Sequence, residues 1–528
     1  MQKNISIFTG KSQSGVALNF STNGNEQVII RTGISMVNIE GAKHNLETEM
    51  QPYGFDFDKL VKVNKDAWNK LLSKAEVFTK NENDKEKFYT NLYRTYTGKS
   101  VMNDVDGKYT DACGIIQQLQ GSGRSVYSSD AWWGTQWNLT PLWTLLNPGI
   151  AESWVNAFLE LADKGGWIPY APVALGYSPI MGAQHQNTLI ISSYQKGIRG
   201  FDVQKAFKDM LHDYTTPGEA YKCGGFAGDR HLASYEKLGY VADEAGPASN
   251  TMEYAYDDWC FAQFAKALGK KETYGRFMLR SKNYKNQFDT TVNYVRRRGT
   301  DGSFVEPFDP NHFGTEGGWN GKGFMEGSPY QYSFFVPQDV PGIIRLMGKD
   351  TFINRLENGF KNNLFDMGNQ PSLAIPFLFN YAGKPWLTQH YTRLMANTMF
   401  DTSPYSGWVG EEDEGQMSAT FVLLSMGLFE VDGGCAVRPF YNLSTPLFDK
   451  IILHLDDKYY PGKTFTILTK NNSIKNEYIQ AATLNGKSIS RAWIYHDEII
   501  GGGTLIFTLG AKPNPDWGTQ LPPADDLK

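Results

Sequence analysis

Two acidic segments of this 528-residue chain carry the residue types that acid–base chemistry requires. The first, residues 410–415, places four consecutive acids between two glycines immediately before a predicted helix. The second, residues 323–339, places Glu326 and Asp339 singly among aromatic residues, glycine and proline, where burial would raise a carboxyl pKa. Hydrolysis of a glycosidic bond needs one protonated carboxyl beside the leaving oxygen and one carboxylate that activates water or attacks the sugar. The two segments could supply that pair.

Neither segment decides its own role. A run of acids such as residues 411–414 is ordinarily a solvated surface or a helix N-cap, and a lone buried glutamate is often structural. Trp408, close to the acidic run, favours a sugar-binding alternative. The aromatic share of 14% is compatible with sugar stacking, but equally with the core of a large protein.

Helices are expected to position both segments. Between Asp56 and residue 428, apolar residues recur three and four apart, and long loops with glycine pairs separate the periodic stretches. Asp66 and Asp84 are predicted N-caps. The pattern favours an (α/α)6 toroid, with the site in the loops at one end, over an irregular helical array. Expected helices include residues 150–163, 203–211, 254–268, 271–294, 340–347, 352–362, 388–399 and 416–427.

β-prone stretches lie on either side of the helical region. Alternation of apolar and polar residues predicts N-terminal strands over 4–8, 16–20 and 26–34, and C-terminal strands over 450–455, 464–469, 478–483 and 504–509. Asn485-Gly486 predicts a hairpin turn. The fold class is therefore mainly α. The expected divisions are an N-terminal β remnant (1–40), a linker and helix (41–70), a catalytic (α/α)6 barrel (71–429) and a C-terminal β-sandwich (430–528).

Composition excludes several classes of partner. The net charge of −5 has no basic stretch behind it, so nucleic acid is not expected as a partner, and no apolar run is long enough for a transmembrane segment. The first eleven residues lack the apolar core of a secretory signal. We therefore expect a cytoplasmic protein, or a periplasmic or secreted one if a signal lies upstream. The cysteines indicate neither a zinc knuckle nor a dense disulfide framework and leave the redox compartment open: Cys113, Cys223, Cys260 and Cys435.

Three motifs, taken together, indicate a family. They are Gly-Phe-Met-Glu326-Gly-Ser-Pro-Tyr-Gln-Tyr with Val-Pro-Gln-Asp339 after it, Gly368-Asn-Gln-Pro-Ser, and Gly410-Glu-Glu-Asp413-Glu-Gly-Gln-Met-Ser-Ala. With further matches in the same order from about residue 30 to 518, they resemble glycoside hydrolase family 92, the calcium-dependent α-mannosidases. The resemblance implies an (α/α)6 barrel flanked by β domains, and an inverting exo-α-mannosidase that removes α-linked mannose from glycans.

The resemblance also implies a role for each matching residue. Glu326 holds the position of the general acid and Asp413 that of the general base, and Glu411 replaces a supporting aspartate. Asn369 and Gln370 lie where the family supplies calcium. The expected sugar-contacting residues are Trp133, His185, Gln331, Asp339, Trp408 and Glu412.

Several departures from the family pattern fall on the site itself. Gln370 replaces a glutamate, Gly134 replaces the aspartate of a Trp-Asp-Thr motif, and Leu373 and Ala374 replace histidines. Calcium binding is therefore expected to be weak or lost. Most of the family's N-terminal β domain also has no counterpart in this chain. Two alternatives to the α-mannosidase stay open: a divergent glycan-binding homologue with little or no activity, and a helical-barrel glycosidase that acts on another sugar.

Overall fold

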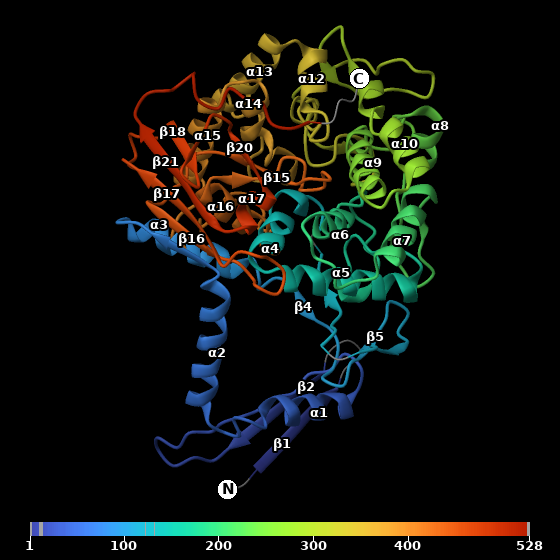
Figure 1. The fold of residues 1–528 in the computed structure, drawn as a ribbon. Helices are drawn as coiled ribbons and strands as arrows, with labels where there is room; N and C mark the ends of the chain where they lie inside the picture. Colours follow the sequence, from blue (N-terminus) through green and yellow to red (C-terminus); the bar gives the residue numbers. More distant parts are fainter. Residues whose placement is uncertain (1–2, 10–13, 122, 131, 525–528) are drawn as a thin grey trace.

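The computed structural model describes residues 3–9, 14–121, 123–130 and 132–524 (Figure 1). The chain begins with an antiparallel hairpin of β1 (Lys3–Thr9) and β2 (Ser14–Phe20), which confirms the first two expected strands. The third expected strand, 26–34, is wrong. Those residues form no strand, and Val28, Ile29 and Ile30 are 41–56% exposed. β propensity alone does not make a strand where no neighbouring strand pairs with the segment.

Two helices connect the hairpin to the main body of the molecule. α1 (Ile39–Met50) follows the hairpin and lies at the same end of the molecule, and α2 (Phe57–Leu72) runs from that end toward the main body (Figure 1). Asp56 caps α2 by accepting from the Lys59 backbone N–H, so the expected N-cap Asp66 is wrong and lies inside the helix. Asp84 likewise lies in the first turn of α3 (Glu82–Arg94), which Asn81 caps. Acids in the first turn favour a helix as a cap does, which explains the error at Asp84.

Buried and half-exposed helices alternate along the chain. Almost every residue is buried in α4 (Leu139–Leu146), α6 (Gln186–Gln195), α9 (Ser249–Ala267) and α16 (Gln416–Met426). A helix buried on all sides lies inside a protein, whereas an amphipathic helix covers it. α16 contacts α4, α4 contacts α6, and α6 contacts α9, so the buried helices form a continuous interior series. The half-exposed helices are α3, α5 (Pro148–Gly165), α7 (Val203–Thr215), α10 (Lys271–Arg280), α13 (Lys349–Lys361) and α15 (Pro385–Thr398).

Shorter elements fill the loops between these helices. The helix expected over 271–294 is wrong in length, since α10 ends at Arg280, whose guanidinium pairs with the buried Asp258. The other short helices are α8 (Leu232–Leu238), α11 (Pro329–Tyr332), α12 (Val340–Met347), α14 (Leu378–Tyr381) and five 3-10 turns, η1 (Thr135–Trp137), η2 (Val173–Leu175), η3 (Asn283–Gln287), η4 (Gln370–Ser372) and η5 (Ile375–Phe377). The paired short strands are β4 (Ser100–Val101) with β7 (Tyr127–Ser128), β5 (Lys108–Thr110) with β6 (Ile116–Gln118), β8 (Glu219–Ala220) with β9 (Phe226–Ala227), β10 (Phe288–Asp289) with β11 (Tyr294–Val295), and β12 (Thr315–Glu316) with β13 (Lys322–Gly323).

The C-terminal region forms two sheets beside the helices (Figure 1). The three-stranded sheet has the order β14 (Leu428–Phe429), β15 (Phe440–Leu443), β20 (Trp493–Tyr495), and α17 (His496–Ile500) follows it. The six-stranded sheet has the order β19 (Lys487–Ile489), β18 (Tyr478–Leu484), β21 (Gly503–Gly510), β17 (Thr464–Lys470), β16 (Lys450–His454), β3 (Ala75–Phe78). All four expected C-terminal strands and the Asn485-Gly486 hairpin are confirmed. β3 lies in the segment expected to belong to the barrel, yet it pairs with β16.

The helical region and the sheets share one apolar core. Phe377 of the helical region stacks on Phe429 of β14 with ring centroids 4.4 Å apart, and Phe88 of α3 packs edge-on against Phe448 at 5.3 Å. Within the described residues, no helix combines the length and the apolar character needed to cross a bilayer. A disulfide joins Cys113 to Cys223, and Cys260 and Cys435 are buried thiols.

The shared core predicts that the helices depend on the sheets. A chain ending at Phe429 would lose Phe448, which packs on Phe88, and the strands β15 and β16 that pair with β14 and β3, and would expose apolar surface large enough to promote association. We expect this shortened chain to aggregate, as measured by size-exclusion chromatography with light scattering, while the full chain stays dispersed. A soluble and fully active shortened chain would contradict the supporting role of the C-terminal unit.

Candidate active site

Both predicted catalytic carboxylates lie on strained backbone. Glu326 has a φ of 46° and Asp413 a φ of 47°, in the left-handed region that residues other than glycine rarely adopt. Such residues cost about 1–3 kcal/mol each and persist where the surrounding structure holds them, often at active sites. Glu326 lies between β13 and α11, and Asp413 precedes α16, so two separate loops present them.

One dipeptide contacts both carboxylates. The Asn369 side-chain amide donates to Glu326 Oε2 at 3.0 Å, and the amide of the next residue, Gln370, donates to Asp413 Oδ2. Pro371 follows in the 3-10 turn η4 and fixes the backbone there. Because the two amides belong to adjacent residues, the two carboxylates lie close to each other. The structure therefore brings together the two residues that the sequence placed 87 positions apart.

Burial changes the acidity of both groups. Burial raises the pKa of Glu326 to about 7, the hydrogen bond from Asn369 opposes this, and the charges of Asp413, Glu411 and Asp366 raise it further. Burial also raises the pKa of Asp413, against the hydrogen bond from Gln370. A glutamate that keeps its proton near neutral pH suits the role of a general acid.

A buried cation lies close to Asp413. The Lys99 ammonium pairs with Glu414 at 3.0 Å, and Glu414 also accepts from the Ser129 hydroxyl at 2.6 Å. The Lys99 charge lowers the pKa of Asp413, whereas the charge of Asp130 raises it. Sequence reasoning missed Lys99 and Asp130, because isolated charged residues far from the acidic run give no local signal.

Three of the expected sugar-contacting residues contact segments that carry or hold these carboxylates. The ring of Trp133 is parallel to that of His185 at 6.4 Å and packs in one apolar cluster with Met325, the neighbour of Glu326. His185 Nδ1 accepts from the Gly134 N–H at 3.1 Å, and burial lowers the pKa of His185 to about 3, so the imidazole is neutral. Gln331 donates to the Ser372 hydroxyl at 2.8 Å, two residues after Gln370.

The remaining expected residues make contacts of other kinds. Glu411 is exposed to solvent, and its backbone N–H donates to the Gly368 carbonyl. Glu412 accepts from the backbone N–H and hydroxyl of Ser418 and so anchors the start of α16. The Arg94 guanidinium lies 4.1 Å above the ring of Trp408. Asp339 accepts from the Gly342 N–H and the Tyr284 hydroxyl and caps α12. For all six expected sugar-contacting residues, contact with a sugar stays a prediction.

The residues expected to hold calcium do not fit that ion. Calcium takes six to eight oxygen ligands, with carboxylates prominent among them. Here both side-chain nitrogens, of Asn369 and Gln370, face the carboxylates, and Asn369 Oδ1 accepts from the Gln370 N–H at 2.7 Å. Gln370 Oε1 is buried without a described partner, so it is one available oxygen. Among the described residues, no three histidine, cysteine, aspartate or glutamate side chains are grouped to bind a metal.

Two departures from the family pattern turn out to be coupled in space. A Cβ atom at Gly134 would lie 2.4 Å from both Cβ and Cγ of Gln370, and Gly134 has a φ of 83°. The aspartate that the family carries at position 134 therefore cannot be accommodated in this arrangement. The space it would need is filled by Gln370, which holds Asp413.

This coupling predicts the effect of a methyl group at position 134. Gly134→Ala should displace Gln370 from Asp413 and lower kcat at least about tenfold, since small displacements in a site have large kinetic effects. Gly166→Ala is the matched control, because Gly166 has a similar φ of 89° but no neighbouring atom within 4 Å of the place its methyl group would take. Equal effects of the two substitutions on kcat would show that backbone strain, and not contact with Gln370, is responsible.

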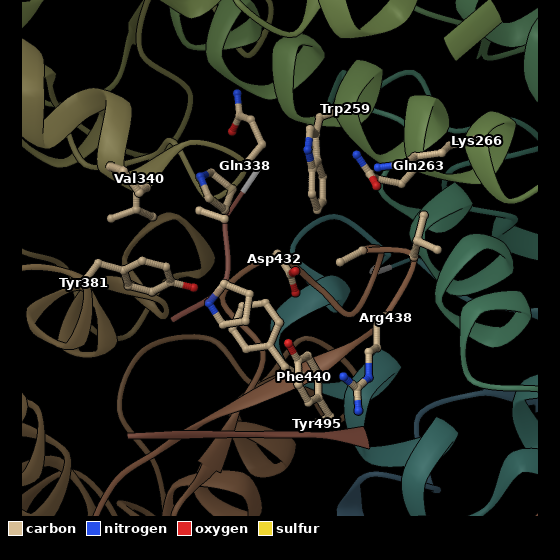
Figure 2. Close-up of a pocket in the computed structure, with 16 residues that line it drawn as sticks. Trp259, Gln263, Lys266, Gln338, Val340, Tyr381, Asp432, Arg438, Phe440 and Tyr495 are labelled. Carbon is tan, nitrogen blue, oxygen red and sulfur yellow. The ribbon is translucent and has the colours of Figure 1, made fainter. Parts of the chain in front are cut away.

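Two cavities differ in their relation to the carboxylates. One of about 470 Å³ is lined by the predicted site residue Gln331 and by Asp366, whose charge acts on Glu326, among others. A second of about 180 Å³ lies between α9, the start of α12 and the three-stranded sheet (Figure 2). Trp259, Asp432 and Arg438 line this second cavity, and none of the predicted site residues does. The first cavity therefore adjoins the candidate active site.

Comparison with known proteins decides the family. The model of the glycosyl hydrolase family 92 catalytic domain matches residues 41–511. The chain belongs to glycoside hydrolase family 92. A family 92 α-mannosidase of Bacteroides thetaiotaomicron, also solved in complex with mannoimidazole, is 28% identical with a TM-score of 0.82. A family 92 inverting mannosidase of the same organism is 27% identical with a TM-score of 0.87 and is covered over 73% of its length, with 98% of this chain aligned.

A curated relative adds a further glycosidase. An uncharacterized secreted glycosidase of Arthroderma benhamiae is 26% identical over 561 residues, which include 99% of this chain. The chain spans 66% of that protein and 64% of the first Bacteroides mannosidase, whereas 93% of this chain aligns with the latter. The chain is therefore shorter than both of these relatives.

Proposed function

We propose that this protein is an inverting exo-α-mannosidase in which Glu326 is the general acid and Asp413 the general base. The observation that carries the proposal is the pair of carboxylates held by the adjacent amides of Asn369 and Gln370. The similar inverting mannosidase and the relative solved with mannoimidazole support mannose as the sugar and a glycan as the substrate.

The reaction needs two proton transfers. Glu326 gives its proton to the glycosidic oxygen as the bond from that oxygen to the anomeric carbon breaks. A water molecule attacks the opposite face of that carbon, and Asp413 takes the proton that the water loses. Mannose then leaves with inverted configuration. An inverting enzyme places its two carboxyls about 6.5–9.5 Å apart to make room for this water.

The neighbouring side chains orient the two carboxyls in this scheme. The amide of Asn369 fixes one oxygen of Glu326, which leaves the other oxygen to carry the proton. Gln370 fixes one oxygen of Asp413 in the same way. Hydrogen bonds of this kind restrict the side chains to a productive geometry. Calcium, expected from the family, is weakly bound or absent in this proposal, and no step depends on it.

Architecture and location are part of the proposal. We propose that the alternating buried and half-exposed helices close into an (α/α)6 barrel and that the two C-terminal sheets form a β-sandwich beside it. We also propose that the protein works outside the cytoplasm. The Cys113–Cys223 disulfide suits an oxidising compartment, and the Arthroderma relative is named as secreted.

Two other functions compete with this one. The absence of a carboxylate at Gly134 and Gln370 favours a glycan-binding protein with little or no turnover, since Gln370 contacts Asp413 and Gly134 lies against Gln370. A helical-barrel glycosidase for another sugar would keep the same carboxylates but a different pocket. Turnover separates the glycan-binding protein from the two glycosidases, and the preferred sugar separates the two glycosidases from each other.

The deciding experiment is hydrolysis of a substrate panel. We expect release of mannose from α-linked mannobioses, with and without EDTA, and no turnover of β-mannosides or of aryl α- and β-glycosides of other sugars. Turnover of a glycoside of another sugar, without turnover of α-mannosides, would favour the glycosidase that acts on another sugar. Binding of mannosides in a calorimeter without any turnover would contradict the enzymatic proposal.

A further inference from the structure

A third carboxyl group lies beneath the site and has no part in the reaction described above. Glu253 belongs to the interior helix α9 and is fully buried. Tyr332 donates its hydroxyl to Glu253 Oε1 at 2.8 Å, and the Trp133 indole N–H donates to Oε2 at 3.3 Å. A buried carboxyl without such partners would strongly destabilise the fold. Both partners belong to segments that carry predicted site residues.

The contact through Tyr332 continues to the loop of the general acid. The Tyr332 hydroxyl also lies 2.8 Å from the carbonyl oxygen of Met325, which directly precedes Glu326. The backbone N–H of Met325 donates to the Ser249 hydroxyl at 3.0 Å. Ser249 and Glu253 are four residues apart and therefore lie on the same face of α9. This face holds the N–H of Met325 directly through Ser249 and its carbonyl indirectly, through the contact of Glu253 with Tyr332.

The number of available donor protons indicates whether Glu253 is protonated in this hydrogen-bond network. A tyrosine hydroxyl has one proton, so it cannot donate fully to both Glu253 and the Met325 carbonyl. A protonated Glu253 donates to the Tyr332 oxygen, Tyr332 donates to Met325, and the second carboxyl oxygen accepts from Trp133. The Glu253 carboxyl, the Tyr332 hydroxyl and the Trp133 indole N–H are then all satisfied. Burial raises the pKa of Glu253 to about 7, which agrees with this arrangement.

We propose that Glu253 is a positioning residue that holds the Glu326 loop in register through Tyr332 and holds the Trp133 ring beside it. This inference rests on the proposed function. The left-handed backbone at Glu326 needs such an anchor, because a strained conformation persists only where its neighbours fix it. Loss of the anchor should misplace the acid and leave Asp413, on another loop, in place.

Leaving groups of different acidity separate this role from a general loss of structure. Dinitrophenolate leaves a sugar without protonation, whereas the hydroxyl of a mannobiose needs the general acid. Tyr332→Phe and Glu253→Leu should each lower kcat on α-linked mannobiose at least about tenfold, less than the loss expected when the general acid is removed. Turnover of 2,4-dinitrophenyl α-mannoside by Tyr332→Phe should stay close to that of the unmodified protein. Glu253→Gln, which resembles the protonated acid in shape and hydrogen bonding, should retain turnover of both substrates.

Tyr330→Phe is the matched control. Tyr330 lies two residues earlier in α11, and its hydroxyl donates to the Arg355 carbonyl and not to the acid loop. We expect it to keep turnover of both substrates. If Tyr332→Phe lowers kcat equally for both substrates, or for neither, the positioning role is wrong. The role is also wrong if Glu253→Gln lowers kcat on mannobiose as much as Glu253→Leu does. Melting curves identify a variant that fails to fold. If a Glu253 variant fails, the two kcat values of Tyr332→Phe test the positioning role. An unmodified protein that hydrolyses neither substrate would overturn the proposed function together with this inference.

Discussion

Replacing Glu326 by glutamine should lower kcat on α-linked mannobiose at least about 10²-fold, the usual size of a general acid effect. Glutamine keeps the shape of the side chain and can still accept from Asn369, but it has no proton to give to the leaving oxygen. Turnover of 2,4-dinitrophenyl α-mannoside should fall much less, since that leaving group needs no protonation. The fold should be unchanged in circular dichroism.

Asp413→Asn should show the complementary pattern. An asparagine cannot accept a proton from water, so kcat should fall at least about 10²-fold for both substrates, whatever their leaving group. Asp401→Asn is the control, because Asp401 is an exposed acid outside the site whose carboxylate accepts from Ser403 and Ser406 of its own loop, and we expect it to keep turnover of both substrates. If Glu326→Gln and Asp413→Asn both keep near-full turnover, the assignment of acid and base is wrong.

Calcium binding should be weak in the unmodified protein and stronger after one substitution. The amide nitrogen of Gln370 faces Asp413, so the pair offers one carboxylate and one amide oxygen where a calcium site needs several charged ligands. Calorimetric titration should reveal no site tighter than about 10⁻⁵ M, the weak end of the range of calcium sensors. EDTA should not change turnover.

Gln370→Glu should tighten calcium binding and make activity depend on the ion. Two carboxylates would then face each other at positions 370 and 413, and their repulsion would disturb the base until a cation lies between them. We expect turnover to drop at least about tenfold in EDTA and to recover with calcium, with magnesium as the comparison ion. A tight site in the unmodified protein, or unchanged affinity after the substitution, would show that the calcium pocket lies elsewhere.

The sequence predicted the regular parts of the fold well. Helices such as α12 over 340–347 and the strands around Asn485-Gly486 follow from periodicity and turn chemistry, which are local. β3 was missed because four residues are too short to show alternation, and it becomes a strand only by pairing with β16, over 370 residues later. The strand expected over 26–34 failed for the opposite reason, since it has no partner among the described residues.

The candidate site was predicted in part, for similar reasons. Glu326 and Asp413 lie in motifs that a sequence displays directly. Glu253 gives no such signal, because a glutamate within a helix is ordinarily taken for its exposed face, and its burial depends on contacts with Trp133 and Tyr332. The coupling of Gly134 to Gln370 is likewise visible only in space, since the two residues are 236 positions apart.

The stereochemistry of the released sugar tests the central claim most directly. Proton NMR can follow the anomeric signals of mannose while the enzyme hydrolyses the methyl α-glycoside of an α-linked mannobiose, whose blocked reducing end releases no free mannose, before the released sugar equilibrates. Direct attack of water activated by Asp413, with Glu326 as the acid, predicts that β-mannose appears first and α-mannose only later by mutarotation. Release of α-mannose first would contradict this account, because it would require a covalent intermediate and a nucleophile in place of a base.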